Sequence, residues 1–189
     1  MQRFLVLFVT LVSCAHMPAP VTLPPEISAA LPPDCRQVLY VTAADQHTSA
    51  AELRMLVHTP SHAWQSVGVP IPIRIGRHGM AWGHGEFGLT APPGWRIKRE
   101  GDGCAPAGIF RITQAFGDQP QPSGIKLPCL HCTAHHWGID DVRSQHYNQI
   151  VDDRVVACDW TSPETMVPTI GCYKLGAIIA HNPHNTPVL

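Results

Sequence analysis

Short runs of apolar residues predict that this chain is built mainly from β-strands. Residues 36–42 (RQVLYVT) and 52–58 (ELRMLVH) are apolar-rich and are separated by a polar loop. Residues 69–75 (VPIPIRI) place an apolar side chain at every second position, which is the period of one face of a sheet. Pro70 and Pro72 lack the backbone N–H that a β-ladder needs, so this strand is expected at a sheet edge or with an irregular start.

The second half of the chain alternates strand signals with turn signals. Residues 76–94 are rich in glycine, which predicts turns and close backbone approaches. Residues 161–164 (TSPE) carry a hydroxyl cap followed by an acid, a helix start that Pro168 limits to about one turn. Further strands are expected at residues 109–112, 155–160 and 176–180. Many short strands punctuated by Gly and Pro indicate a single mainly β, sandwich-like domain.

The first residues have the pattern of an export signal. Arg3 precedes an apolar run at residues 4–11, which is shorter than the roughly 20 residues that span a bilayer. The run ends in LVSC, a sequence similar to a bacterial lipobox, which would place a lipid on Cys14. An ordinary signal cleaved near Ser13 or Ala15 is the alternative.

This signal divides the chain into three expected parts. Residues 1–13 are predicted to be a signal peptide, and residues 14–33 a lipid-anchored tether rich in Pro and Ala. Residues 34–189 then form the folded domain, held at a membrane through the lipid anchor. The expected location is the bacterial cell envelope, facing the periplasm or the outer surface of the cytoplasmic membrane.

Composition and cysteine spacing limit the partners, disulfides and metal sites that can be expected. The formal net charge is −1 and no basic run occurs, which argues against nucleic acid as a partner. Six cysteines besides Cys14 permit many disulfide pairings, and buried free thiols remain the alternative. Cys129 and Cys132 precede His135 and His136, but these ligands lie too close in sequence for a typical structural zinc site. No metal and no cofactor are therefore expected.

Several motifs resemble, in order, those of the L,D-transpeptidase catalytic domain family. They are GRHGMAWG at 76–83, KREGDG at 98–103 with PAGIF at 106–110, DDVRS at 140–144 with YNQIVD at 147–152, and AHN at 180–182. The resemblance extends from Gln37 to Asn182. It implies a single β-sandwich-type domain with short helices.

The resemblance also implies an activity, which is cysteine-dependent acyl transfer between peptidoglycan stem peptides. That chemistry needs a thiolate generated by a nearby histidine. The family carries both groups on a segment that follows the AHN motif, whereas only residues 183–189 follow it here. The expectation is therefore a homologue without its terminal strands and without activity. The sequence TIGC at 169–172 leaves Cys172 as a weak candidate nucleophile, because its neighbours align upstream of the family's motif.

The family-like motifs provide candidates for a substrate groove. These are Lys98, Glu100, Asp102, His181 and Asn182, and the implied ligands are peptidoglycan stem peptides. The alternative function is a non-catalytic lipoprotein that binds peptidoglycan or an envelope partner.

Two further expectations concern the acidic residues and glycines of these motifs. The glycines beside Asp102 allow positive φ, and the Asp side chain is expected to bond its own turn. Asp140 and Asp141 are expected to cap a turn rather than to share a proton, because adjacent strand residues face opposite ways.

Overall fold

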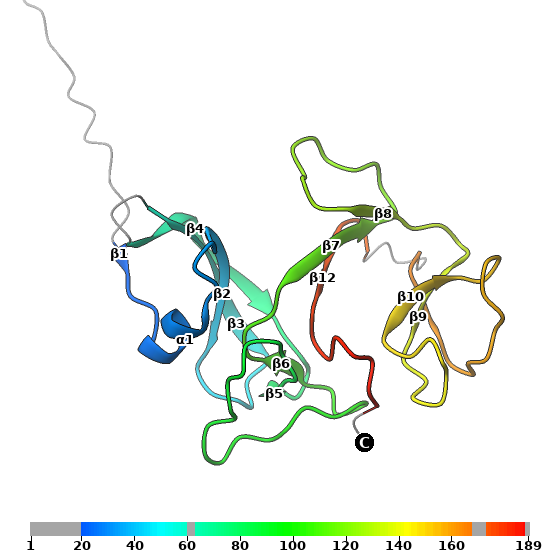
Figure 1. Cartoon of the computed structure of the whole chain (residues 1–189), viewed down its shortest axis with the longest axis horizontal. Helices are drawn as coiled ribbons and strands as arrows, with labels where there is room; N and C mark the ends of the chain where they lie inside the picture. The colour runs from blue at the N-terminus through cyan, green and yellow to red at the C-terminus, as the bar shows by residue number, and fades with distance from the viewer. Residues whose placement is uncertain (1–19, 60–62, 168–172, 188–189) are drawn as a thin grey trace, which may run out of the picture.

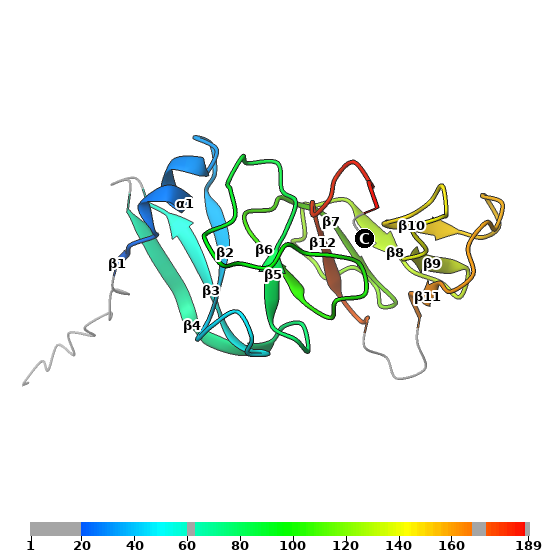
Figure 2. The ribbon, with the colours of Figure 1, turned by 90° about the horizontal axis from the view of Figure 1, so that it is seen from below.

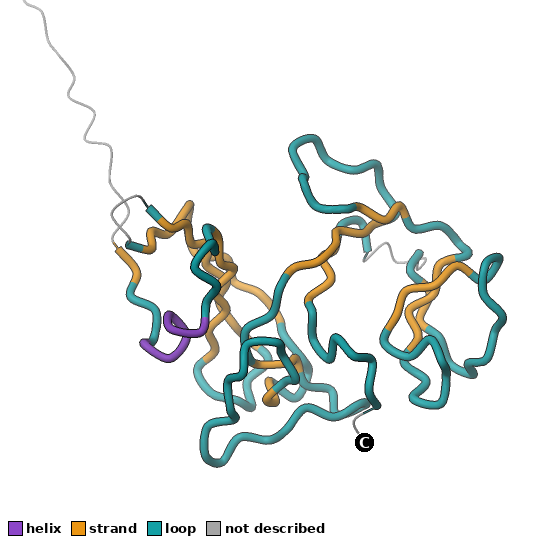
Figure 3. Tube along the Cα trace, viewed as in Figure 1, coloured by secondary structure: helices purple, strands orange, loops and turns teal. Residues whose placement is uncertain are grey.

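The chain is mainly β in the computed structural model, which describes residues 20–59, 63–167 and 173–187. Separate small sheets follow one another along the long axis in roughly chain order, and the C-terminal segment returns to the middle (Figures 1 and 2). Much of the backbone between the strands consists of turns and loops (Figure 3). The expected mainly β class is confirmed.

The first sheet contains four antiparallel strands. Its order is β1 (Pro20–Val21), β4 (Trp64–Arg74), β3 (Ala50–His58) and β2 (Gln37–Ala43). The three longer strands match the three apolar-rich runs at the start of the chain. A single short helix, α1 (Pro25–Ala30), lies beside the sheet within the described part of the chain (Figure 1).

The residues expected to form a tether differ from that expectation in their second half. β1 pairs with the start of β4, and Leu23 is only 4% exposed. Leu56 in β3 is completely buried. Residues 20–30 are thus part of the folded structure, because Leu23 gains more from burial than an extended tether would allow.

The prolines of β4 lie where the sheet leaves their side of the strand open. β1 covers only Trp64 and Gln65, whereas Pro72 pairs with Glu52 of β3 on the other side. Among the described residues, no strand pairs with these prolines on the side of β4 that faces away from β3. The predicted edge position is confirmed, because a residue without an N–H is tolerated where no ladder bond is required.

Two small sheets occupy the middle of the molecule. β5 (Met80–Trp82) and β6 (Ala105–Ala107) form a parallel pair. β7 (Ile112–Gly117) lies between the antiparallel β12 (Gly176–Ile179) and the parallel β8 (Cys129–His131). The strand expected at residues 176–180 is therefore present, and it returns the C-terminal segment to the centre of the molecule.

The last sheet carries its own small core. β9 (His136–Ile139) pairs with β10 (Gln149–Asp152) on one side and with β11 (Glu164–Thr165) on the other. Ile139, Val151 and Trp160 are buried against one another.

The helix expected from Thr161 is wrong. Residues 161 and 162 form a bend, and β11 begins at Glu164. The Thr161 hydroxyl donates to Asp141 at 2.9 Å and accepts from the Arg143 guanidinium at 3.2 Å, instead of accepting from a helical N–H. The hydroxyl that was expected to cap the helix is thus engaged in a tertiary contact.

Two strand predictions also need correction. Residues 155–160 form a turn and a loop, because the N–H groups of Val155 and Val156 both donate to the carbonyl of Asp152. In the run 109–112 only Ile112 belongs to a strand, and the strand nearby is β6 at Ala105–Ala107.

Five described cysteines are free thiols: Cys35, Cys104, Cys129, Cys132 and Cys158. Cys129 begins the strand β8 (Cys129–His131) and Cys132 follows its end, and neither forms a disulfide.

No helix among residues 20–59, 63–167 and 173–187 is long and apolar enough to cross a membrane. The predicted signal peptide and lipid attachment at Cys14, and the candidate nucleophile Cys172, lie outside the described residues.

Truncation of Leu56 tests the centre of the first sheet. We expect Leu56→Ala to lower the free energy of unfolding by about 2–5 kcal/mol, because it leaves a cavity at a fully buried site. Urea denaturation followed by circular dichroism measures this change. The matched control Val69→Ala removes methyl groups from the same sheet at a side chain that is 81% exposed, and should change stability by less than about 0.5 kcal/mol. Equal losses in the two variants would contradict this account of the core.

Candidate functional site

The loop between β5 and β6 is shaped by its own acidic residue. The carboxylate of Asp102 accepts hydrogen bonds from the N–H groups of Arg99 and Cys104, each at 2.8 Å. Gly101 and Gly103 have φ angles of 71° and 69°. The predicted Asp-centred turn is confirmed, and positive φ is the reason that glycine occupies both positions.

Lys98 is held inside this turn. Its ammonium lies 2.8 Å from the Asp102 carboxylate and also donates to the Arg99 carbonyl. Burial alone would raise the pKa of Asp102, but the hydrogen bond from Arg99 and the charge of Lys98 outweigh it and lower the pKa. Both side chains are mostly buried, so this ion pair stabilises the loop from within.

Glu100 points away from this pair toward the last sheet. One carboxylate oxygen accepts from the Gly101 N–H at 3.1 Å, and the other accepts from the Tyr147 hydroxyl at 2.8 Å. Tyr147 lies in the turn between β9 and β10 and is 6% exposed. Burial, followed by the bond to Glu100, raises the pKa of Tyr147 to about 12. The phenol therefore stays neutral over the physiological pH range.

The segment after β12 completes the site. The N–H of Asn182 donates to the carbonyl of His84 at 2.7 Å, and the Asn148 amide donates to the carbonyls of His181 and Asn182. The side chain of Asn182 lies close enough to Tyr147 to act on its phenol, lowering the pKa against the larger effect of burial. Asn148 and Asn182 have φ angles of 61° and 51°, a region that Asn tolerates better than most residues.

The imidazole of His181 lies between the loop and an aromatic ring. Its Nδ1 accepts from the His84 N–H at 3.3 Å, and its ring meets Phe110 edge-on with centroids 5.7 Å apart. A Cβ at Gly83 would come within 3.0 Å of that nitrogen, so glycine is required for this approach. Burial, helped by the charge of Lys98, lowers the pKa of His181. The ring is therefore neutral at pH 7.

These contacts join six residues that we term the polar cluster: Lys98, Glu100, Asp102, Tyr147, His181 and Asn182. All five groove candidates from the sequence belong to it. Tyr147 was missed as a site residue, although the motif YNQIVD contained it. The asparagine that follows this tyrosine was the available signal, since Asn tolerates positive φ better than most residues.

Asp140 and Asp141 have separate environments, as expected. The Asp141 carboxylate accepts from the backbone N–H and the side chain of Arg143 and from Thr161, which lowers its pKa. Asp140 instead has a raised pKa because of burial and then the nearby charge of Glu100. The two carboxylates therefore do not share a proton: Asp141 caps a turn, whereas Asp140 adds negative charge beside the polar cluster.

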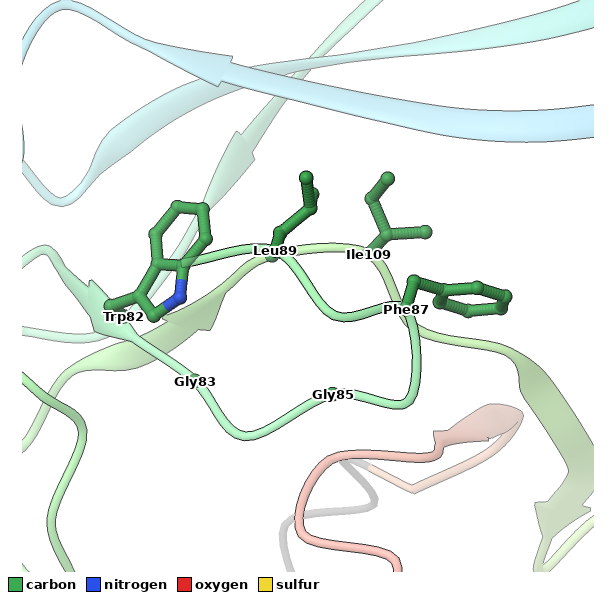
Figure 4. Close-up of a pocket in the computed structure, with 7 residues that line it drawn as sticks. Trp82, Gly83, Gly85, Phe87, Leu89 and Ile109 are labelled. Atoms are coloured by element: carbon green, nitrogen blue, oxygen red, sulfur yellow. The ribbon is translucent and has the colours of Figure 1, made fainter. Parts of the chain in front are cut away.

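A small hollow adjoins the cluster at Gly83. It is lined by Trp82, Gly83, Gly85, Phe87, Leu89, Gly108 and Ile109 (Figure 4). Its cavity volume is about 10 Å³, which is room for about one water molecule. The hollow is too small to enclose a cofactor, so a ligand would have to lie across the open surface.

Among the described residues, the polar cluster and its neighbours include no obvious metal centre and no exposed nucleophile. Within the described ranges, no group of three or more His, Cys, Asp or Glu is arranged to bind a metal ion. The nearest cysteine in sequence, Cys104, is 8% exposed, and its sulfur faces the carbonyls of His78 and Asp102 at 3.5 and 3.8 Å. The cluster offers a cation, carboxylates, a phenol and an imidazole, which suits recognition of a polar, zwitterionic ligand.

No protein-family model, no curated protein and no solved structure matches this chain.

The pH dependence of stability should reveal the buried phenol. The folded pKa of Tyr147 is about 12, above the unfolded value of about 10. Its contribution is complete below about pH 10 and is lost as the pH rises through the folded value. The difference in unfolding free energy between wild type and Tyr147→Phe should stay constant up to about pH 10 and change above it. If the curves of unfolding free energy against pH stay parallel for the two proteins above pH 10 as well, the raised pKa of Tyr147 is contradicted.

Acidification should act on His181. Its folded pKa is lowered below the unfolded value of about 6.5, so its contribution is complete above that pH and is lost as the pH falls. Stability should therefore decline below about pH 6.5 in wild type more steeply than in His181→Gln. Chemical denaturation between pH 5 and 8 measures both curves (the range is set by the usual titration of histidine, roughly 5 to 8).

Proposed function

We propose that this chain is an L,D-transpeptidase-like protein of the bacterial envelope that binds peptidoglycan stem peptides without catalysing their transfer. One observation supports the binding role above the others. Five residues selected from family-like motifs, on segments about 80 residues apart in sequence, lie at one place: Lys98 pairs with Asp102 and Glu100 bonds Tyr147. The charges of the Lys98 loop also act on His181, and Asn182 acts on Tyr147. Motifs that are far apart along the chain thus lie at one place in the structure.

The chemistry of the cluster fits this ligand class. Stem peptides carry ammonium groups and carboxylates on an extended backbone. Glu100 and the adjacent Asp140 are carboxylates without an ion pair among the described contacts, whereas Lys98 is neutralised by Asp102. An ammonium group of the ligand would restore charge balance beside Glu100. The open surface and the small hollow favour an extended peptide over an enclosed small molecule.

The proposed lack of catalysis follows from the groups present in the cluster. Acyl transfer of this kind needs a thiolate beside a base, with backbone donors for the oxyanion. His181 supplies an imidazole, but the described contacts bring no thiol to it. The folded part of the chain, which begins before residue 34, is proposed to have the sandwich-type fold of the family, and a lipid on Cys14 is proposed to hold it at the membrane.

Sedimentation with purified sacculi tests binding. We expect the protein to be retained and Glu100→Gln to bind about tenfold more weakly, since a hydrogen bond to a charged group contributes about 1.5–3 kcal/mol. Glu52→Gln is the matched control, because it makes the same change in β3, outside the polar cluster, and should bind like wild type. Absence of retention, or equal weakening in both variants, would count against the proposal.

A carbapenem tests the absence of catalysis. Incubation followed by intact-mass spectrometry should leave the mass of the protein unchanged. A stable adduct that disappears in Cys172→Ala would identify a nucleophile and overturn the non-catalytic part of the proposal.

A further inference from the structure

Strand β2 ends the first sheet with an open side. The strand order places β3 on one side of β2, and no other described strand pairs with it (Figure 2). Gln37, Leu39, Val41 and Thr42 are exposed along this strand. An open edge presents a row of backbone donors and acceptors to any extended chain that approaches.

The register shows which backbone groups face outward. The N–H of His58 donates to the carbonyl of Arg36 at 2.9 Å, so Arg36 directs its backbone toward β3. Alternate residues of an antiparallel strand face the same neighbour. Leu39 and Val41 therefore direct their N–H and C=O groups away from β3. Within the described part of the chain, no hydrogen bond engages these groups.

The sequence of β2 contains no residue that would prevent pairing with another strand. QVLYVTA contains no charge and no proline. The opposite side of the sheet differs, because β4 carries Pro70 and Pro72 where its own edge is open. Prolines and charges on edge strands block association, so within the first sheet the β2 edge is left without the protection that the prolines give β4.

The exposed side chains of this edge are apolar. Leu39 is 48% exposed and Val41 37% exposed, and each continues a cross-strand row on one face of the sheet. Leu39 lies opposite Met55, and Met55 lies opposite Val67. A partner that pairs with β2 would extend this face and bury Leu39 and Val41 at the junction.

We propose that the partner is β2 of a second copy of this chain, paired antiparallel about a two-fold axis at Tyr40. In this register Leu39 faces Val41 of the second copy, and the same contact repeats across the axis. All four residues direct their backbone groups outward, so each pair exchanges both of its hydrogen bonds. The contact is isologous, and the uncharged strand meets itself without repulsion. A membrane surface would cover the apolar side chains but would not satisfy these backbone groups.

Charge placed on the edge tests this dimer. Sedimentation equilibrium of the full chain should give about twice the mass of one chain at high concentration. Val41→Lys should dissociate it, raising the dimer dissociation constant at least tenfold, and Leu39→Lys should act similarly if Val41→Lys folds poorly. The matched control Val69→Lys places the same charge on β4 at a side chain that is 81% exposed, away from the β2 edge, and should remain dimeric.

A cross-link tests the register independently. At a two-fold axis Tyr40 faces itself in a non-hydrogen-bonded pair, with Cα atoms about 4.5 Å apart, which is within disulfide range. Tyr40→Cys should form a covalent dimer when diamide accepts the two protons and two electrons released by the thiols. Val69→Cys and the wild-type chain should form far less.

Three outcomes would overturn the proposal. The first is a monomeric wild type at every concentration tested. The second is dissociation by Val69→Lys but not by Val41→Lys, which would indicate sheet-to-sheet packing. The third is flotation of a monomeric chain with phosphatidylglycerol vesicles that Val69→Lys abolishes, which would assign the apolar face to a membrane.

Discussion

The hydrogen bond from the Tyr147 phenol to the Glu100 carboxylate joins two parts of the chain that no described strand pair connects. Glu100 belongs to the loop between β5 and β6, whereas Tyr147 belongs to the turn between β9 and β10. A bond to a carboxylate is stronger than one between neutral groups, and burial of the phenol strengthens it further. The position of the last sheet relative to the middle of the molecule depends on this contact and on the segment after β12.

The C-terminal segment after β12 connects the same two parts of the chain. β12 pairs with β7, so the chain is carried back to the middle, and Asn182 then bonds His84 from the loop after β5. Asn148 holds the carbonyls of His181 and Asn182 from the other side. Three loops from three sheets therefore meet through directed polar contacts. Such contacts position side chains accurately, which is what a recognition site on an otherwise loop-rich protein requires.

The apolar core is distributed unevenly among the sheets. The last sheet buries Ile139, Val151 and Trp160 together, and the first sheet buries Leu56 completely. The other face of the first sheet leaves Val69 and Ile71 more than half exposed. The resulting contrast between a closed face and an open face makes the first sheet the natural surface for association, while the polar cluster lies elsewhere on the molecule.

The amino-acid sequence by itself determined the mainly β class and much of the local geometry. Apolar-rich runs located β2 and β3, alternating apolar positions located β4, the prolines of β4 indicated an open edge, and Gly–Asp–Gly predicted the turn around Asp102. These features depend on backbone sterics and on neighbours in sequence, so they can be deduced from the residues alone. The motif order also selected five of the six members of the polar cluster.

Only the tertiary structure decided where the remaining groups act. Thr161 has a helix-start signal, yet its hydroxyl bonds Asp141, which lies 20 residues earlier. Tyr147 became a site residue because a distant carboxylate accepts a hydrogen bond from its hydroxyl, and Leu23 joined the core because the first sheet offered it a buried surface. In each case the free energy comes from a partner far away in sequence, and no local pattern encodes that partner.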